Sequence, residues 1–316
     1  MEGGKLNSKT TEDLVEVINI FGEERLIYKT RPIDVALIRA TYADETGNIS
    51  MHKEVCPCDA TAMAQAARNS GGIVIVQVER VVKAGSIDPK LVKIPGILVD
   101  AVVVSTPEEH QQCFNKDYDP TLTGEALAPE GAFEPLPLSA KKIIGRRAAM
   151  ELTENTVVNL GIGAPEYVSA VANEEGIGDY MTLTVEAGPI GGIPMGGTHF
   201  GGSRNADCYF DQNVMFDFYD GGGIDLAFLG LAQADESGNV NVSKFGPRIA
   251  GCGGFIDITQ NAKKVFFCGT FTAGGLKTSI KDGKLVIDNE GKEKKLINEV
   301  EQITFSGAYA NKTNQP

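Results

Sequence analysis

Short apolar runs alternate along this chain with segments whose apolar residues recur at helical spacing. Buried strands are predicted over residues 73–78, 102–104, 157–160 and 265–268. Helices are predicted over residues 10–18 and 139–152, with Ser139 as the N-cap of the second. Because strands and helices alternate, the pattern favours an α/β fold with mostly parallel sheets.

An internal repeat indicates how these elements are arranged along the chain. Residues 34–48 (DVALIRATYADETGN) align without gaps with residues 225–239 (DLAFLGLAQADESGN). In each copy an apolar run meets Ala-Asp-Glu-(Thr/Ser)-Gly-Asn, a polar turn that should end a buried strand. Each copy later returns to an apolar strand, at Ile73 and at Val265. We therefore predict two lobes built on one topology.

The segment between the two lobes has no sustained period. Residues 115–138 carry Pro120, Pro129, Pro135 and Pro137, which predicts a linker with a domain boundary near Pro137. We expect residues 1–136 to form the later part of the first lobe plus the linker, and residues 137–316 to form the second lobe. Residues 139–223 precede the second copy of the repeat, whereas only residues 1–33 precede the first. The first lobe is therefore expected to lack its opening half.

Composition and charge narrow the function classes. The net charge of −13 argues against a nucleic-acid or anionic-membrane partner, because both need a basic surface. The sequence has no apolar run long enough to cross a bilayer and no leader-like start, so a cytoplasmic protein is expected. Cys56-Pro57-Cys58 lacks a second cysteine cluster, and the other cysteines are scattered, so reduced thiols are expected and zinc is not. His52, His110 and His199 are isolated, which gives metal hydrolysis and Ser-His chemistry little support.

A first candidate site lies in residues 159–168, where a predicted strand runs into Gly161 and Gly163 before Pro165 opens a helix. Glycines at such a turn let backbone amides and a helix N-terminus approach an anion closely. The dinucleotide fingerprint fails here, because Glu166 stands at its third glycine. The alternative is a tight strand-to-helix turn without a ligand.

Glu186 is the second candidate, because it follows an apolar strand and enters a turn that contains Gly188. We expect it at the carboxyl end of a strand, where open α/β sheets bind their ligands. Apolar neighbours and glycine amides would desolvate and orient its carboxylate as a nucleophile. The alternative is a charged turn residue that faces solvent. A third candidate is the Gly253-Gly254 pair, whose N–H groups are suited to an oxyanion hole.

Three segments together resemble the family I coenzyme A transferases of the single-chain acetate and propionate type: residues 184–192 (TVEAGPIGG), 216–225 (FDFYDGGGID) and 251–257 (GCGGFID). Further matching stretches are residues 3–7, 71–83 and 267–277. The resemblance implies two similar lobes, each with a mostly parallel, helix-covered sheet. It also implies Glu186 as the nucleophile and Gly254 as an oxyanion donor. Contacts to coenzyme A or substrate are implied for Gly161, Gly163, Gly188 and Gly253.

The chain departs from the family pattern at both ends. Family members have a long stretch before the segment that matches residues 3–7, and they continue beyond residues 303–307. We therefore expect this chain to lack the other oxyanion donor and part of the coenzyme site.

The implied reaction transfers coenzyme A by a ping-pong mechanism between short-chain acyl-CoA thioesters and free carboxylates of the acetate, propionate, butyrate or lactate class. Its intermediates are an acyl-glutamyl anhydride and a glutamyl-CoA thioester on Glu186. Coenzyme A is a substrate, so no cofactor or metal is implied, and a homo-oligomer (dimer or tetramer) is expected. Two alternatives stay open: a sugar-phosphate isomerase-like enzyme with Glu186 as general base, and an inactive fragment or split-gene subunit that needs an N-terminal partner.

Overall fold

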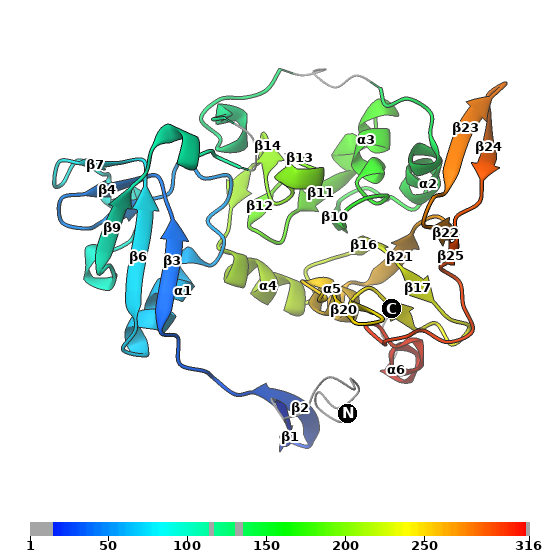
Figure 1. Cartoon of the computed structure of the whole chain (residues 1–316), viewed down its shortest axis with the longest axis horizontal. Coiled ribbons are helices and arrows are strands. Elements are labelled where there is room, and N and C mark those ends of the chain that lie inside the picture. The colour runs from blue at the N-terminus through cyan, green and yellow to red at the C-terminus, as the bar shows by residue number, and fades with distance from the viewer. Residues whose placement is uncertain (1–14, 114–116, 130–134, 314–316) are drawn as a thin grey trace.

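The computed structural model describes residues 15–113, 117–129 and 135–313, which form two α/β lobes side by side. Figure 1 shows the first lobe at the left, in blue and cyan, and the second lobe at the centre and right. Each lobe has its own apolar core. Residues 3–7, one of the stretches that resemble the family, lie outside the described residues.

The first lobe is built on a parallel sheet in the order β3-β6-β9, with a second, mixed sheet in the order β7-β4-β5-β8. One face of the parallel sheet packs against α1, whose buried alanines meet the valines of β6. The elements are β3 (Val35–Arg39), β4 (Tyr42–Asp44), β5 (Ile49–Ser50), α1 (Ala60–Asn69), β6 (Ile73–Val78), β7 (Arg80–Val82), β8 (Val92–Ile94) and β9 (Ala101–Val104).

The second lobe has one sheet in the order β15-β12-β11-β10-β16-β21, in which β11, β10, β16 and β21 run parallel. Helices α2 and α3 cover one face of it, and α4 and α5 cover the other. The strands are β10 (Thr156–Leu160), β11 (Met181–Thr184), β12 (Pro189–Ile190), β15 (Cys208–Tyr209), β16 (Leu226–Gly230) and β21 (Lys264–Cys268). The helices are α2 (Ala140–Ala149), α3 (Tyr167–Glu174), α4 (Gln212–Asp220) and α5 (Phe255–Asn261).

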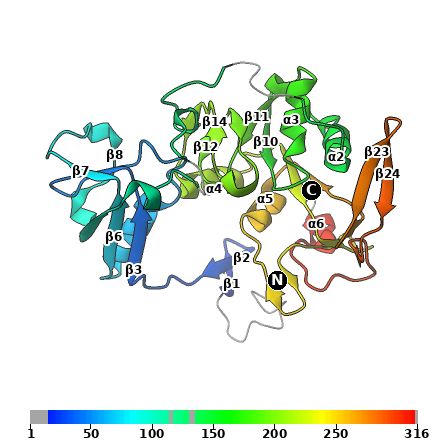
Figure 2. The same cartoon turned by 45° about the horizontal axis from the view of Figure 1, so that its top comes forward.

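Small two-stranded pairs complete the chain, and two of them stand out from the lobes in both views (Figures 1 and 2). These two are β1 (Val15–Ile20) with β2 (Glu23–Tyr28), and β23 (Lys277–Lys281) with β24 (Lys284–Asn289). The others are β13 (Ile193–Pro194) with β14 (Ser203–Arg204), β17 (Gln233–Ala234) with β18 (Val240–Asn241), β19 (Lys244–Phe245) with β20 (Arg248–Ile249), and β22 (Thr272–Ala273) with β25 (Glu293–Lys294). The last helix is α6 (Gly307–Thr313). No helix in the described ranges has the length and apolar content that a membrane span requires.

The predicted strands and the second predicted helix are confirmed, and Ser139 caps α2 by accepting a hydrogen bond at Oγ from the Lys142 amide at 3.2 Å. The helix predicted over residues 10–18 is wrong where it can be compared, because residues 15–18 belong to strand β1. The β-branched residues of this segment favour a strand. The turn at Phe21 and Gly22, both with positive φ, closes a hairpin that pairs the segment with β2.

The internal repeat is confirmed in both the turns and the strand register. The Asp44 carboxylate accepts hydrogen bonds from the amides of Thr46 and Asn48, and Asp235 does the same for the matching amides two and four residues later. In the first lobe Val35 pairs with Ile73, and in the second Leu226 pairs with Lys264, so the partner is equally distant in sequence in both copies. The two lobes therefore share one strand–turn–helix–strand frame.

The predicted linker is packed against the second lobe over the part that the structure describes. Leu122 is fully buried, and its carbonyl accepts a hydrogen bond from the Tyr209 hydroxyl at 2.9 Å. The Ala128 amide donates to Asn205 Oδ1 at 2.8 Å. These contacts come from an irregular segment, which has no period to reveal them in the sequence. The domain boundary near Pro137 stays a prediction.

Candidate active site

Glu186 lies in a tight turn directly after β11, at the carboxyl end of that strand. The turn is closed by hydrogen bonds from the Gly188 amide to the Val185 carbonyl and from the Val185 amide to the Pro189 carbonyl, both at 2.9 Å. The Glu186 side chain points inward: a Cβ placed on Gly254 would lie 3.4 Å from its carboxyl carbon. The alternative of a solvent-facing turn residue is therefore wrong.

The surroundings of Glu186 raise the pKa of its carboxyl group, chiefly because burial disfavours the charged form. A hydrogen bond from Asn159 acts in the opposite direction and lowers that pKa. Since a desolvated carboxylate is less well stabilised by water than an exposed one, it is a stronger nucleophile when it is ionised.

A buried polar network lies behind this carboxylate and was not predicted from the sequence. Asn159 on β10 donates from Nδ2 to the Tyr219 hydroxyl at 3.3 Å, and that hydroxyl donates to Thr184 Oγ1 at 2.9 Å. All three side chains are buried, and burial raises the pKa of Tyr219 above its usual range. The network fixes the Asn159 side chain, because its amide can rotate only by breaking these bonds.

The paired glycines lie opposite Glu186 at the start of α5. Gly254 is the N-cap of this helix, and a side chain there would come within 2.9 Å of the Phe216 ring. Gly253 has a φ of 54°, in the left-handed region that favours glycine. Among the described residues, no hydrogen-bond acceptor is found for the amide of either glycine. Both glycines border the same pocket as Glu186, and we expect their N–H groups to be able to bind an oxyanion there.

One open pocket, with a volume of about 470 Å³, joins these parts. The predicted residues Gly161, Glu186, Gly253 and Gly254 all line it, together with apolar side chains that include Ile162, Phe200, Leu231 and Phe245. Strand-end glycines provide the polar part of the wall, and the apolar side chains would exclude water from an acyl group.

Two other predicted residues do not line this pocket. Gly188 has a φ of 130°, and a Cβ there would lie 2.1 Å from the Phe210 carbonyl oxygen, so glycine is needed to form the turn. Gly163 has a φ of 97° in the predicted strand-to-helix turn before α3. Direct contacts of Gly163 and Gly188 with coenzyme A or substrate stay predictions.

The first lobe reaches the turn that carries Glu186 through residues 55–58. The Pro57 ring lies 3.4 Å from a Cβ placed on Gly188, and the Cys58 carbonyl accepts a hydrogen bond from the Gln212 amide at 3.0 Å. An ion pair between Lys93 and Asp211 joins the lobes at the same place. No pattern in the sequence predicted this contact, because it joins segments distant along the chain.

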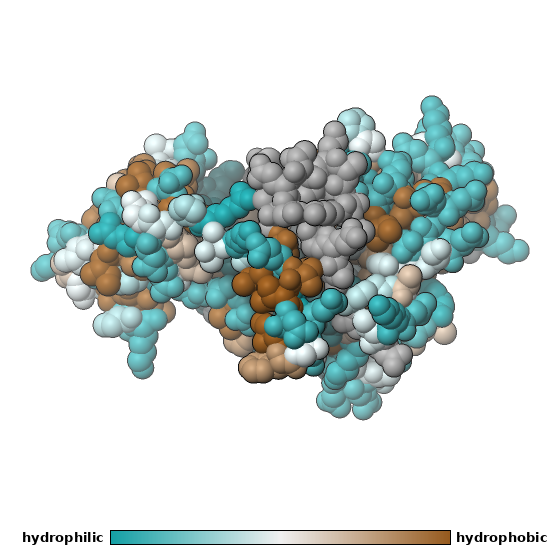
Figure 3. All heavy atoms as spheres, turned by 90° about the horizontal axis from the view of Figure 1, so that it is seen from below, coloured by the Kyte–Doolittle hydropathy of each residue, from teal (hydrophilic) through white to brown (hydrophobic). Residues whose placement is uncertain are grey.

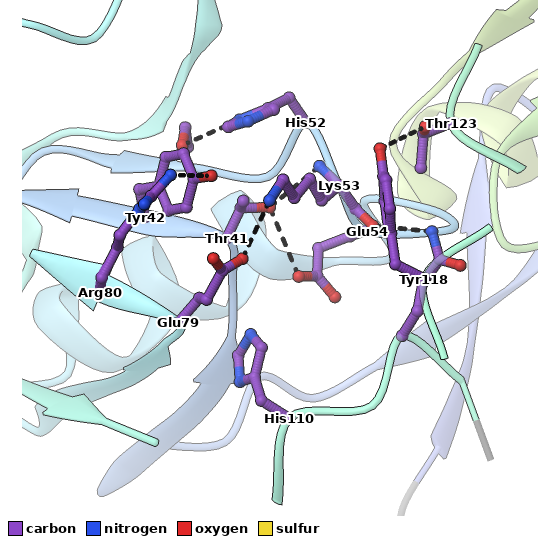
Figure 4. Close-up of polar contacts among 12 residues, drawn as sticks. Thr41, Tyr42, His52, Lys53, Glu54, Glu79, Arg80, His110, Tyr118 and Thr123 are labelled. Carbon is purple, nitrogen blue, oxygen red and sulfur yellow. Dashed lines mark hydrogen bonds and ion pairs between the residues drawn. The ribbon is translucent and has the colours of Figure 1, made fainter. Parts of the chain in front are cut away.

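A polar cluster occupies the matching position in the first lobe, at the carboxyl ends of β3 and β6 (Figure 4). The Lys53 amine lies 3.1 Å from Glu79 Oε2 and about 5 Å from the ring centres of Tyr42 and Tyr118. Arg80 donates to the Tyr42 hydroxyl at 2.6 Å. The cationic groups of this cluster thus pair with a carboxylate, with aromatic faces and with a hydroxyl group.

Glu54 is the buried carboxylate of that cluster. It pairs with Arg39 at 3.5 Å, and burial raises the pKa of its carboxyl group. The guanidinium of Arg39 also donates to the carbonyls of Gln112 and His110. By the register of the repeat, Arg39 and Glu54 stand where Gly230 and Phe245 line the pocket beside Glu186. In the second lobe the uncharged residues at these positions line a pocket of about 470 Å³, whereas in the first lobe the paired charges at these positions line a smaller pocket of about 290 Å³.

In the ranges that the structure describes, no three or more His, Cys, Asp or Glu side chains gather as a possible ion site. The arrangement of Glu186 instead offers a desolvated carboxylate beside two amides. This pairing suits covalent attack on a carbonyl carbon whose oxygen becomes negatively charged.

Comparisons with known proteins agree with this arrangement. A family model described as "Coenzyme A transferase" matches residues 4–105. The caffeate CoA-transferase of Acetobacterium woodii is 51% identical to the chain, over 100% of this chain and 61% of that protein.

The apoenzyme structure of the acyl-CoA transferase YdiF from Escherichia coli O157:H7 superposes with a TM-score of 0.89 and 43% identity, over 99% of this chain and 59% of that one. A thioester complex of YdiF with CoA gives a TM-score of 0.87, over 99% of this chain and 58% of that one. The chain thus spans roughly three fifths of the length of these relatives. From its fold and its sequence, the chain belongs to the coenzyme A transferase family.

Proposed function

We propose that this protein transfers coenzyme A between acyl-CoA thioesters and free carboxylates, with Glu186 as the nucleophile. The observation that carries the proposal is the position of the Glu186 carboxyl carbon, 3.4 Å from where a Cβ on Gly254 would lie, within one pocket. A partly buried carboxylate and a backbone amide that line the same pocket can act on the same carbonyl group.

In the first half-reaction a Glu186 carboxylate oxygen attacks the thioester carbonyl carbon. The Gly254 N–H stabilises the tetrahedral oxyanion, and the C–S bond then breaks to give an acyl-glutamyl anhydride and coenzyme A thiolate. The thiolate attacks the glutamyl carbonyl and releases the first carboxylic acid, which leaves a Glu186–CoA thioester. An acceptor carboxylate reverses these steps. Orientation together with one oxyanion donor supplies on the order of 10 kcal/mol of barrier reduction.

The experiment that tests this function traps the intermediate. The protein is incubated with acyl-CoA without an acceptor and treated with hydroxylamine, and the modified residue is located by peptide mapping. We expect a hydroxamate on Glu186 and none in a Glu186→Gln variant. A Glu54→Gln variant is the matched control, since Glu54 is the buried carboxylate of the other lobe. Wild-type turnover by Glu186→Gln would refute the nucleophile.

We propose short-chain acids of the acetate, propionate, butyrate or lactate class as substrates, because one relative is named for acetate. Another relative is named for caffeate, so aromatic acids are the competing class. A methylene group in an apolar pocket changes specificity by only about 1–3 kcal/mol. Initial rates for a panel of acyl-CoA donors against short-chain and aromatic carboxylates would rank them. A preference for cinnamate-type acids over acetate would replace the short-chain class.

The proposed ligands are acyl-CoA and carboxylic acids, and the protein is expected to form a dimer or tetramer.

Because the chain spans roughly three fifths of the length of its relatives, activity is measured with and without the N-terminal portion of a relative supplied in trans. Activity only in its presence would identify the chain as a subunit that needs an N-terminal partner. Protection of Glu186 by sugar phosphates and not by coenzyme A would favour the isomerase-like alternative.

A further inference from the structure

The Cys56-Pro57-Cys58 segment brings two thiol groups together. The two sulfur atoms lie 3.3 Å apart, and Cys58 has a φ of 46°, in a region that non-glycine residues seldom adopt. Residues two apart in a bent loop have Cα atoms within about 7 Å of each other, which a disulfide can bridge. From the sequence, reduced thiols were expected, because Cys56 and Cys58 are too close along the chain for ordinary disulfide pairing, whereas the structure places their two sulfurs in contact.

The two thiols differ in access. Cys58 is exposed, whereas Cys56 is partly buried. The hydrogen bond between them lowers the pKa of Cys58 and raises that of Cys56. Because the thiolate is the reactive form, Cys58 is the sulfur that an oxidant would meet first, with Cys56 next to it as the second thiol.

The loop that holds these thiols contacts the turn of the proposed nucleophile. Pro57, between the two cysteines, packs 3.4 Å from a Cβ placed on Gly188, two residues after Glu186. Gly188 cannot retreat, because its backbone already lies against the Phe210 carbonyl. The Cys58 carbonyl is held by the Gln212 amide. A change in the backbone of residues 56–58 is therefore transmitted to the turn that positions Glu186.

We propose that Cys56 and Cys58 form an oxidisable dithiol that a hydroperoxide converts into a disulfide, and that this disulfide loosens the Glu186 turn through Pro57. The second half of the proposal rests on the proposed function, because only then does the Glu186 turn carry the reaction.

The Cys58 thiolate attacks one oxygen of hydrogen peroxide, the O–O bond breaks, and hydroxide leaves, which gives a sulfenic acid. The hydroxide takes up the proton that Cys58 lost on ionisation and becomes the first water. The Cys56 thiol then attacks the Cys58 sulfur, and its proton passes to the departing hydroxyl group, which leaves as the second water. Two thiols lose two electrons and two protons, and peroxide becomes two water molecules. Glutathione reverses the step by thiol–disulfide exchange, because a disulfide across one residue is strained and easily reduced.

The first experiment measures the bond itself and does not depend on enzymatic activity. The full chain is treated with hydrogen peroxide, its remaining thiols are alkylated under denaturing conditions, and the tryptic peptide of residues 54–68 is weighed. We expect this peptide to become lighter by two hydrogen atoms and to escape alkylation, and glutathione to reverse both changes. Cys56→Ser and Cys58→Ser should each abolish the bond, and Cys208→Ser, at an exposed cysteine elsewhere, should keep it. Full alkylation of both cysteines, or a sulfinic acid on Cys58, would overturn the proposal.

The second experiment measures the coupling. Hydrogen exchange of residues 185–190 should become about fivefold faster in the oxidised chain and stay unchanged in peroxide-treated Cys56→Ser. Unchanged exchange in a chain that carries the disulfide would overturn the coupling. If the reduced protein transfers no coenzyme A under any condition, the proposed function fails, while the peptide mass still decides whether the dithiol exists.

Discussion

The two copies of the internal repeat have the same local structure and very different surroundings. Strand β3 of the first copy is buried on one face only, and Val35 and Leu37 on its other face are 46% and 72% exposed. At the same repeat positions in β16, Leu226 and Phe228 are 5% and 0% exposed, because α2 and α3 cover them. Figure 3 shows apolar patches on the first lobe, at the left, in the face seen from below. The same strand pattern can thus be part of a closed core or of a surface.

The two copies share the frame of the lobe but differ in the polar residues that the frame carries. Both copies carry the same aspartate turn and the same parallel strand pair. Asn159 and Glu186 come instead from the segment that precedes the second copy, and Gly254 comes from the loop that follows this copy and leads into α5. At the corresponding place the first lobe holds the paired charges around Glu54. The repeated frame is therefore common to both lobes, and the segment that precedes the second copy provides Glu186, the proposed nucleophile.

The largest expected effect distinguishes the two buried carboxylates. Glu186→Gln should lower the rate of coenzyme A transfer by about 10⁴-fold or more, because it removes the nucleophile, and Glu186→Asp should leave a trace. Glu54→Gln should keep the rate within about threefold and instead lower the free energy of unfolding by about 1–3 kcal/mol, because Arg39 loses its charged partner. Steady-state kinetics and urea unfolding of each variant check this. Equal loss of activity in both variants would contradict the division of roles.

The next largest effect is on the free energy of unfolding, and it differs between the covered strand β16 and the open strand β3. Phe228→Ala should lower the free energy of unfolding by about 3–5 kcal/mol, since it leaves a cavity beside Phe266, with which Phe228 stacks. Leu37→Ala, at the matching repeat position, should cost less than about 0.5 kcal/mol, because the side chain is exposed. Denaturant titration followed by circular dichroism measures both values. A cost at Leu37 near that of Phe228 would show that this face is covered in solution.

A somewhat smaller effect is expected at the glycine pair. Gly254→Ala should lower the transfer rate by about 10²–10³-fold, because the added methyl group meets Phe216 and displaces the amide from Glu186. Met63, at the same repeat position in the first lobe, is partly exposed, so Met63→Ala is the matched control and should change the rate little. Melting temperatures recorded with the kinetics separate a local effect from unfolding. An unimpaired Gly254→Ala enzyme would exclude the proposed oxyanion donor.

The smallest effect is a shift of pH dependence. The pKa of Glu186 is raised by burial, and the attacking form is the ionised one, so kcat/KM should be full above that pKa and fall as the pH decreases through it. Asn159→Ala removes the hydrogen bond that lowers this pKa, so the acidic limb should move to higher pH. Asn48→Ala, in the turn of the first lobe, should leave the limb in place. If the acidic limb of the kcat/KM profile does not move in Asn159→Ala, Asn159 does not control the pKa of Glu186.

Much of the fold followed from local pattern. The strands around Ile73 and Val265, the helix capped by Ser139 and the repeated turn were predictable, because periodicity and turn chemistry are properties of neighbouring residues. The N-terminal helix was wrong because its β-branched residues pair across a hairpin turn. Of the site, Glu186 and Gly254 could be found from motifs that resemble the family. Asn159 could not, because its significance comes from a neighbouring strand.

By itself, the sequence determined the α/β class and the duplicated frame, and it identified the candidate carboxylate and glycines, because each of these signals lies in residues adjacent along the chain. Only the tertiary structure decided which of these groups meet. It placed Glu186 beside Gly254, backed it with Asn159, and set the Pro57 loop of the first lobe against the turn of Gly188. Such contacts join residues far apart in sequence, and they exist because burying apolar surface fixes how strands and loops pack in three dimensions.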